Sequence, residues 1–493
     1  MSPTTPRLRS RLARALLVAA SAVLYVSAFP LTSFWPLIFV ALVPALWATA
    51  GLTARQAFGH GVGLGFLIGA LGLTWFWSLL GPLTLALWLI LGLWFGLFFW
   101  GRALLHRRLP LLPAVAGTIL WWTAVEFFRA ECYPLRASFL CLGHALAAEG
   151  CAYRLAAGAV GAYGLGTLAI AANVGFAGLC RTARRGPPAA RFFGVLAVSA
   201  FLILQGLVAQ QMWARSAPSE DPGDAEYLAA CAVQHEPGAL GSLLKLSRSA
   251  RGARPRWIFW PELSVSGDVL ARPWLRKPIA RLARDTGAVV GVGCRLDYPD
   301  DRDKFWNGYV LFAPDGRPIG TYKKVQPVPF TNDGVPGSDY PVFEANGAAL
   351  GVAICYDGDF SWVSRRLVAN GAELLVIPTL DPLHWGDRMR EQHLAAAVLR
   401  AVENDRWVVR PANTAPTVII DSWGHIAARR DERGPGLLIA WVRPRQSRPF
   451  YTRGGWLWPY VCQGLSVCLL AWALLARRGR KGAASDPPRG RPG

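Results

Sequence analysis

The sequence predicts a membrane α-helical bundle joined to a globular α/β domain. The chain is 53% hydrophobic and only 17% charged, and its mean hydropathy of +0.28 is high for a soluble protein of 493 residues. Long apolar stretches, a mixed polar segment and one last apolar stretch follow one another. We therefore expect a transmembrane domain of about seven helices (1–213), an α/β domain (214–450), a C-terminal transmembrane helix (451–476) and a basic, disordered tail (477–493).

Apolar stretches of about 20 residues, the length that a helix needs to cross a bilayer, define the membrane part. They are residues 14–29, 33–51, 61–80, 82–104, 110–128, 155–180, 192–213 and 456–476. Arginines precede the first stretch and fill every second loop, whereas alternate loops such as FPLTS carry almost no basic residues. The positive-inside rule then predicts that both termini are cytoplasmic and that residues 214–450 lie outside the cytoplasm.

The net charge of +21 is concentrated in the membrane part of the chain. Residues 214–450 hold 30 of the 52 lysines and arginines but 27 of the 31 acidic residues, so this segment is nearly neutral. Basic residues grouped in short loops beside apolar spans are a topology signal. We therefore expect the lipid bilayer as a partner and no nucleic-acid binding.

The polar segment alternates strand-like and helix-like patterns, which is typical of an α/β domain. Strands are predicted at residues 228–234, 257–262, 288–294, 307–316, 350–355, 373–379, 407–413, 416–424 and 436–442. Helices are predicted at 274–287, 362–372 and 388–405, where apolar residues recur three and four positions apart. About 235 residues are enough to bury a complete core.

The nine cysteines show no CxxC pair and no Cys/His spacing typical of zinc, so the sequence indicates no structural metal and no cofactor. We expect Cys231 and Cys294, which lie in strand-like runs, to be buried apolar residues. The histidines have no partner motif, and we expect His393, inside a predicted helix, to be a structural polar group.

Three ionisable side chains stand at the ends of apolar strands: Glu262 in FWPELS, Lys324 in TYKKVQPVPF and Cys355 in GVAICYD. A cysteine becomes a nucleophile where a base takes its proton and a cation stabilises developing charge. Because strand ends meet at one edge of a sheet, the three side chains can converge. Taken singly, each has an ordinary alternative: a helix cap, a solvated lysine and a packed thiol.

The order Glu, Lys, Cys within WPE, YKK…VPF and ICYD resembles the nitrilase superfamily, and above all its membrane branch, the apolipoprotein N-acyltransferases. The stretches AFPLTSFWP, VEFFRA, FWNGYVLF, EQHLAAAVLRAVEN, RPANTAPTVIIDSWG and YTRGGWLWPYV extend the resemblance over nearly the whole chain. The resemblance implies a nitrilase-like αββα sandwich, wrapped in membrane helices, in the inner membrane of a bacterium with the catalytic domain on the periplasmic side.

Carried to this sequence, the resemblance implies that Cys355 is the nucleophile, Glu262 the general base and Lys324 the oxyanion stabiliser. Supporting or substrate-binding positions are Tyr356, Asp357, Asp333, Trp385 and Asn413. The implied reaction transfers an acyl chain from a membrane phospholipid, through a thioester on Cys355, to the α-amino group of the diacylglyceryl-cysteine of an apolipoprotein.

Some positions depart from the family pattern. Thr331 and Asn332 replace the usual Gly-Glu after Val-Pro-Phe, which makes Asp333 the nearest acid, and the segment between the lysine and cysteine motifs is short. LDPLHWGD replaces the family's Asp-Trp-Phe-Gly loop, and Trp385 is the counterpart of the tryptophan in that loop. These differences leave open a membrane-anchored amidase, an acyltransferase with another acceptor, or a non-catalytic paralogue.

Overall fold

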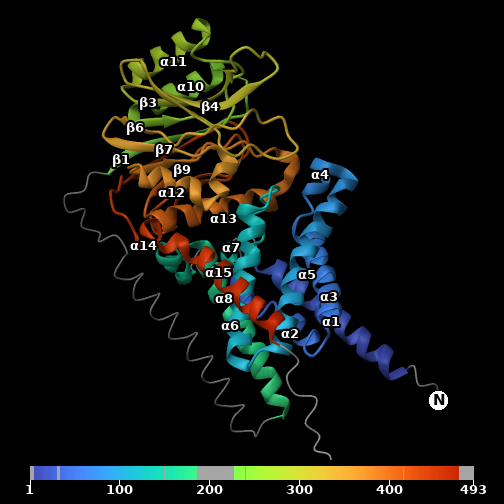
Figure 1. The fold of residues 1–493 in the computed structure, drawn as a ribbon. Helices are drawn as coiled ribbons and strands as arrows, with labels where there is room; N and C mark the ends of the chain where they lie inside the picture. Colours follow the sequence, from blue (N-terminus) through green and yellow to red (C-terminus); the bar gives the residue numbers. More distant parts are fainter. Residues whose placement is uncertain are drawn as a thin grey trace, which may run out of the picture.

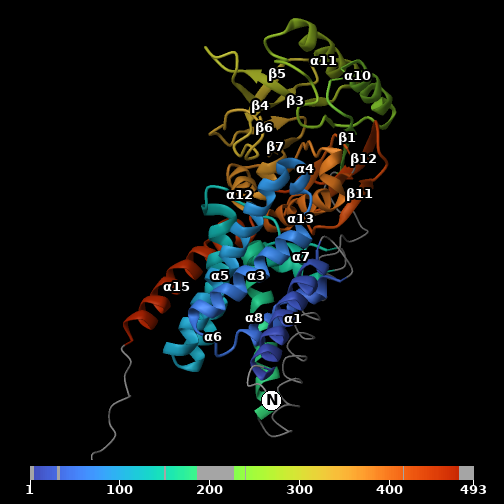
Figure 2. The ribbon, with the colours of Figure 1, turned by 90° about the vertical axis from the view of Figure 1, so that its right-hand side faces the viewer.

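A computed structural model describes residues 5–29, 34–148, 151–185, 227–238, 240–414 and 416–476. The expected span 192–213 and the tail 477–493 lie outside these residues. The α/β domain lies at one end of the molecule and the apolar helices extend from its lower face (Figure 1). In the view turned by 90°, the free end of α15 lies at the far end of the helical part (Figure 2).

The helical part is built from long helices that pack side by side. Its elements are α1 (Thr5–Ser27), η1 (Trp35–Phe39), α2 (Val43–Ala48), α3 (Ala54–Gly72), α4 (Phe76–Leu80), η2 (Gly81–Leu83), α5 (Thr84–Arg108), α6 (Leu111–Phe127), η3 (Phe128–Cys132), α7 (Leu142–Ala145), η4 (Ala152–Ala156), α8 (Ala157–Arg185), α14 (Phe450–Arg453), η8 (Gly455–Leu457) and α15 (Trp458–Leu475). Four segments of the described chain are long and apolar enough to cross a membrane: Phe76–Arg108, Leu111–Cys132, Tyr153–Leu179 and Gly455–Leu475.

Two of the predicted spans have a different form. The prediction of one helix over 33–51 is wrong: a 3₁₀ turn and the short helix α2 replace it, and Pro36 and Pro44 stand at their starts. A proline has no N–H to continue a helix, which explains the break. The predicted span 61–80 is divided between α3 and α4, and α3 begins earlier, at a capping box of Thr53 with Gln56.

The α/β domain is a four-layer αββα sandwich, which confirms the expected fold class. Its strands are β1 (Leu228–Gln234), β2 (Trp257–Phe259), β3 (Val289–Asp297), β4 (Phe305–Phe312), β5 (Pro318–Lys323), β6 (Val342–Ala345), β7 (Ala348–Val352), β8 (Leu374–Val376), β9 (Trp407–Arg410), β10 (Thr417–Ile420), β11 (Ile426–Arg430) and β12 (Gly436–Val442). One six-stranded sheet has the order β12-β1-β2-β3-β4-β5, and the other has the order β11-β10-β9-β8-β7-β6. In each sheet three central strands are parallel and the outer strands are antiparallel.

Helices cover both outer faces of the sandwich (Figure 1). The helices and short turns of this domain are α10 (Leu240–Ser249), η5 (Ala250–Ala253), α11 (Pro273–Thr286), η6 (Cys355–Asp359), α12 (Ser361–Ala369), η7 (Leu383–Trp385) and α13 (Gly386–Asn404). Helices α10 and α11 lie on the sheet that contains β1–β5 and β12. Helices α12 and α13 lie between the sheet that contains β6–β11 and the membrane helices. Residues of α12 and α13 share one buried apolar cluster with α1, α3 and α5, so the two parts have a continuous core.

All nine predicted strands and three predicted helices are present, although several strands are shorter than predicted. Strands β5, β6 and β11 and helix α10 were not predicted from the sequence. In β5 and β11 most side chains are partly or fully exposed, so the apolar run that marks a buried strand is missing. Cys231 and Cys294 are fully buried, as predicted.

Close packing of β3 against the segment that carries Glu262 gives a stability test. A Cβ at Gly293 would lie 2.2 Å from the carbonyl oxygen of Pro261 and 2.7 Å from the Cα of Glu262. We expect Gly293→Ala to lower the free energy of unfolding by about 1–3 kcal/mol, as overpacking does in other cores. Thermal unfolding of the detergent-solubilised chain measures the change.

The matched control is Gly252→Ala, because a Cβ there meets nothing within 4 Å. We expect the melting temperature of this variant to stay near that of the wild type. Equal melting temperatures for the two variants would contradict the tight contact at Gly293.

Candidate active site

Glu262 lies just after β2 and is buried, with 2% of its surface exposed. Its carboxylate accepts hydrogen bonds from Lys324 Nζ at 2.8 Å, from Asn307 Nδ2 at 2.6 Å and from the backbone N–H of Leu380 at 2.8 Å. Burial raises the pKa of Glu262 above its ordinary value, Lys324 opposes this shift and the negative charge of Asp333 adds to it. A carboxylate with a raised pKa is a stronger base, which suits it for proton transfer.

Lys324 follows β5 and is 1% exposed. Its ammonium group lies 2.8 Å from Glu262 and 2.7 Å from Asp333. Burial lowers the pKa of a lysine, but Glu262, Cys355 and Asp333 raise it, and the net pKa lies well above the ordinary value. Lys324 is therefore a permanent cation inside the domain.

Asp333 supplies a carboxylate beside Lys324, although Asn332 stands where the family usually has a glutamate. Its Oδ2 also accepts the backbone N–H of Val328 at 2.8 Å, and its Oδ1 accepts Asn307 Nδ2 at 2.6 Å. Asn307, in β4, thus bridges the two carboxylates that flank the ammonium group. Sequence analysis did not select Asn307, because an amide inside a strand carries no distinguishing pattern.

Cys355 follows β7 at the start of η6 and is 3% exposed. Its φ of +49° lies in the left-handed region that non-glycine residues seldom adopt, and its N–H donates to the carbonyl of Pro378 at 2.9 Å. Such strain concentrates at functional positions. Burial and Glu262 raise the pKa of the thiol well above its ordinary value, whereas Lys324 lowers it. The thiol is therefore protonated at rest, close to a base and a cation.

Asp357 joins the lysine and cysteine segments. Its carboxylate accepts the hydroxyl of Tyr322 at 2.8 Å and the backbone N–H groups of Val325, Gln326 and Ile354 at 3.2, 2.7 and 3.1 Å. Burial raises its pKa to about 7, against the effects of Lys324 and these hydrogen bonds. Asp357 therefore fixes the backbone on which two of the candidate residues stand.

The remaining predicted positions differ in how close they come to the thiol. Tyr356 and Trp385 line the same cavity as Cys355, and the Tyr356 hydroxyl donates to the carbonyl of Arg136 at 2.7 Å. Asn413 instead accepts the backbone N–H of Asp381 at 2.7 Å and is not among the residues that line this cavity. Asn413 therefore holds the backbone of the loop after β8 through this hydrogen bond.

An apolar cavity extends from Cys355 to the membrane helices. The helical part supplies Leu73, Trp75, Phe76, Leu79, Leu87, Ile90, Leu91 and Trp94 to its lining. The α/β domain supplies Val328, Pro329, Phe330, Tyr356, Trp385 and Met389. The thiol thus stands at the polar end of a space whose other walls suit a hydrocarbon chain.

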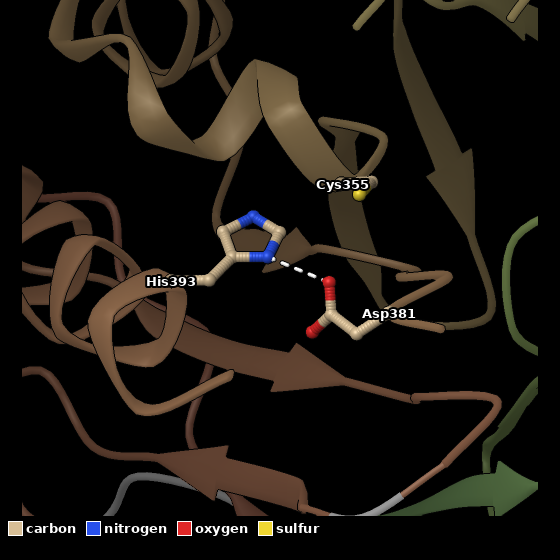
Figure 3. A group of neighbouring side chains, drawn as sticks. All are labelled: Cys355, Asp381 and His393. Carbon is tan, nitrogen blue, oxygen red and sulfur yellow. Dashed lines mark hydrogen bonds and ion pairs between the residues drawn. The ribbon is translucent and has the colours of Figure 1, made fainter. Parts of the chain in front are cut away.

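A second charged group lies beside the thiol and was missed by the sequence analysis. His393 Nδ1 lies 2.9 Å from Asp381 Oδ1, and a ring nitrogen of His393, a carboxylate oxygen of Asp381 and the sulfur of Cys355 all lie within 4.8 Å of one another (Figure 3). Asp381 follows β8 and also binds Arg410 at 2.6 Å. The expectation that His393 has only a structural role did not foresee this position, because twelve residues separate it from Asp381 in sequence.

Two family descriptions match the chain. Residues 229–450 match the carbon-nitrogen hydrolase family, and residues 21–175 match the apolipoprotein N-acyltransferase N-terminal domain. An apolipoprotein N-acyltransferase of Azotobacter vinelandii is 29% identical over 95% of this chain and 96% of its own length. One from Pseudomonas syringae is 26% identical over 90% of this chain and 93% of its own.

Two solved structures are similar to about half of this chain. An amidase from Nesterenkonia sp. has 21% identity and a TM-score of 0.39, and covers 47% of this chain and 95% of its own. The NitFhit protein of C. elegans has 21% identity and a TM-score of 0.40, and covers 46% of this chain and 62% of its own.

Replacing Asp357 by Asn tests its linking role. The amide has one acceptor oxygen in place of two and brings an NH₂ group toward N–H donors, so we expect a loss of about 1–3 kcal/mol of stability. We also expect slower alkylation of Cys355, because the cysteine segment loses a fixed backbone contact. Thermal unfolding and mass spectrometry of the alkylated peptide measure the two effects.

The matched control is Asp339→Asn, an exposed aspartate whose partner is the hydroxyl of Ser338. This change should leave both the melting temperature and the alkylation rate near the wild-type values. A stable Asp357→Asn chain with unchanged alkylation would refute the linking role.

Proposed function

The chain belongs to the apolipoprotein N-acyltransferase family, and we propose that Cys355, Glu262 and Lys324 carry its acyl transfer. The cavity that joins the membrane helices to Cys355 is the observation that supports this proposal, because it gives a lipid chain access to a thiol beside a base and a cation. The acyl donor we propose is a membrane phospholipid, and the acceptor is the α-amino group of a diacylated apolipoprotein.

In the first half-reaction Glu262 takes the proton of the thiol, and the sulfur of Cys355 attacks the ester carbonyl of the phospholipid. Lys324 stabilises the oxyanion that forms. The tetrahedral intermediate collapses to a thioester on Cys355, and the lysophospholipid leaves as its alcohol with the proton returned by Glu262.

In the second half-reaction the amine of the acceptor attacks the thioester carbonyl. Glu262 removes a proton from the nitrogen, and the thiolate of Cys355 leaves and is reprotonated by Glu262. The products are an amide on the acceptor and the free thiol. A thioester keeps the acyl group reactive during the exchange of one lipid for the other, so both lipids can use one cavity in turn.

The roles of the neighbours follow from their contacts. Asp333 and Asn307 hold Lys324 and Glu262 in place. Tyr356 and Trp385 form part of the wall against which the acyl chain packs. Asp357 fixes the backbone of the lysine and cysteine segments, and Asn413 supports the loop of Asp381.

Trapping the thioester tests the proposal. We expect the purified chain, mixed with a phospholipid, to gain the mass of one acyl chain on the Cys355 peptide, and Cys355→Ala to gain none. Cys294→Ala is the matched control, since Cys294 is a buried cysteine of the same domain that does not line the cavity. An acyl adduct that persists in Cys355→Ala would refute the nucleophile.

The acceptor is tested in cells. In a bacterial strain depleted of its own N-acyltransferase, the wild-type chain should add a third acyl chain to lipoprotein N-termini, as read by mass spectrometry. Cys355→Ala should leave these N-termini diacylated. A trapped thioester without triacylated lipoproteins would refute the acceptor and keep the donor chemistry.

We also propose that the α/β domain lies outside the cytoplasm, on the periplasmic side of the inner membrane, with both chain termini inside. The last turn of α5 carries His106, Arg107 and Arg108, and Arg108 donates to the carbonyl of Ala476 after α15 at 3.1 Å. The basic end of α5 thus meets the end of α15, which supports this orientation.

Cysteine labelling tests the orientation. Trp274, 68% exposed in α11, and Leu112, 81% exposed near the start of α6, report the two ends of the molecule. In a background with Cys132 and Cys468 replaced by Ser, we expect a membrane-impermeant maleimide to label Trp274→Cys in intact spheroplasts. Leu112→Cys should label only after permeabilisation. The reverse pattern would invert the proposed orientation.

A further inference from the structure

We propose that His393 is a positioning residue for Cys355: as an imidazolium between Asp381 and Asp359, it balances two buried carboxylates beside the thiol and so allows the thiolate to form. The inference deepens the proposed function and rests on Cys355 being the nucleophile. It adds a second cationic group beside the thiol, in addition to Lys324.

The two ring nitrogens of His393 both face carboxylates. Nδ1 lies 2.9 Å from Asp381 Oδ1, and Nε2 lies 3.4 Å from Asp359 Oδ1. The contact with Asp381 is a hydrogen bond, whereas the contact with Asp359 is an ion pair only when the ring is protonated, so an imidazolium is attracted to both carboxylates. His393 is 3% exposed and the two aspartates are 1% and 2% exposed, so water does not screen these charges.

The pKa values of His393 and Asp381 shift in the directions that favour their ion pair, whereas burial raises the pKa of Asp359 above its ordinary value, against the effects of His393 and Ser138. Burial lowers the pKa of His393, but Asp381 and Asp359 raise it, and the net pKa lies above the ordinary value. Burial raises the pKa of Asp381, but His393 and Arg410 lower it, and the net pKa lies below the ordinary value. Both shifts favour the ion pair between His393 and Asp381.

The thiol lies close to this ion pair. The sulfur of Cys355, a carboxylate oxygen of Asp381 and a ring nitrogen of His393 all lie within 4.8 Å of one another (Figure 3). Asp359 is in the same short helix as Cys355, four residues further along. His393, Asp359 and Cys355 also line one cavity. Charges at this distance in a buried site act directly on the thiol–thiolate equilibrium.

The imidazolium balances the charge of the buried groups around it. Asp359 and Asp381 are opposed by His393 and by Arg410, whose guanidinium lies 2.6 Å from Asp381 and 3.4 Å from the ring of His393. The four groups then sum to zero. Loss of the imidazolium charge leaves one unbalanced carboxylate beside Cys355, and a nearby negative charge raises the pKa of a thiol.

The other charged groups around His393 have ion-pair or hydrogen-bond partners of their own. Arg400, on the same helix, pairs with Glu403 and donates to the carbonyl of Asp359 at 3.2 Å. Arg129, from the helical part, lines the cavity and donates to the carbonyls of Ala137 and Phe139. Lys324 pairs with Glu262 and lowers the pKa of the thiol. His393 is the group in this set that faces both aspartates.

The test measures the thiolate of Cys355 directly. The full-length chain in detergent, without lipid substrate, is alkylated with iodoacetamide over a range of pH, and the Cys355 peptide is followed by mass spectrometry. We expect His393→Gln to move the midpoint of alkylation upward by about one pH unit, which makes alkylation about tenfold slower below the midpoint.

Two further variants separate charge from packing. Asp359→Asn removes a negative charge, so it should move the midpoint downward, and His393→Gln with Asp359→Asn should return it toward the wild-type value. A role in packing alone predicts no such return. His425→Gln is the matched control: His425 pairs with Asp421 at 2.9 Å but does not line the cavity, so its midpoint should equal the wild-type value.

Each outcome decides the inference. If the midpoint is unchanged in both His393→Gln and Asp359→Asn, the inference is wrong, whereas the thioester test of Cys355 is unaffected because alkylation uses no acyl donor. Should His393→Gln fail to fold by thermal unfolding, Asp359→Asn alone decides: a downward shift supports the charge balance, and no shift overturns it.

Discussion

The arrangement of the active site depends on one buried cation. Lys324 is almost completely removed from water, which is unfavourable for an ammonium group unless carboxylates compensate for the lost hydration. Glu262 and Asp333 do so from two directions, and Asn307 holds both in place. Three charged groups with a sum of one negative charge have a strong affinity for one more proton.

Attachment to the membrane helices completes this site. A soluble αββα domain would leave the mouth of the cavity open to water, whereas here Trp75, Leu87 and Trp94 form its walls. The membrane helices share one buried apolar cluster with α12 and α13, so the two parts pack together without a gap around the cavity. Exclusion of water favours acyl transfer over hydrolysis of a thioester and strengthens the electrostatic effects inside.

The sequence predicted those features that depend on local pattern. Apolar strands followed directly by Glu262, Lys324 and Cys355 mark positions at which a charged or reactive group is unusual. The structure brings Glu262 and Lys324 into contact with each other, and both charges shift the pKa of the Cys355 thiol. The contact of Asp333 with Lys324 depends on the path of a loop, which no pattern reports. The pair of His393 with Asp381 joins a helix to the loop after β8, and Asn307 is one amide within a strand, so neither could be found without coordinates. The continuous helix predicted over 33–51 failed because hydropathy does not register the effect of Pro36 and Pro44 on hydrogen bonding.

A protonated thiol at rest follows from the surroundings of Cys355. A bare thiolate facing an apolar cavity would have little hydration, and burial raises its pKa accordingly. The charge can form when an ester carbonyl is present to receive the sulfur electrons, because the negative charge then moves to an oxygen that Lys324 can reach. The strained backbone at Cys355 and the hydrogen bond of its N–H to Pro378 hold the sulfur at the end of the cavity before that moment. In the proposed mechanism the domain therefore keeps Cys355 neutral until a lipid carbonyl arrives, which limits side reactions of the thiol while the cavity is empty.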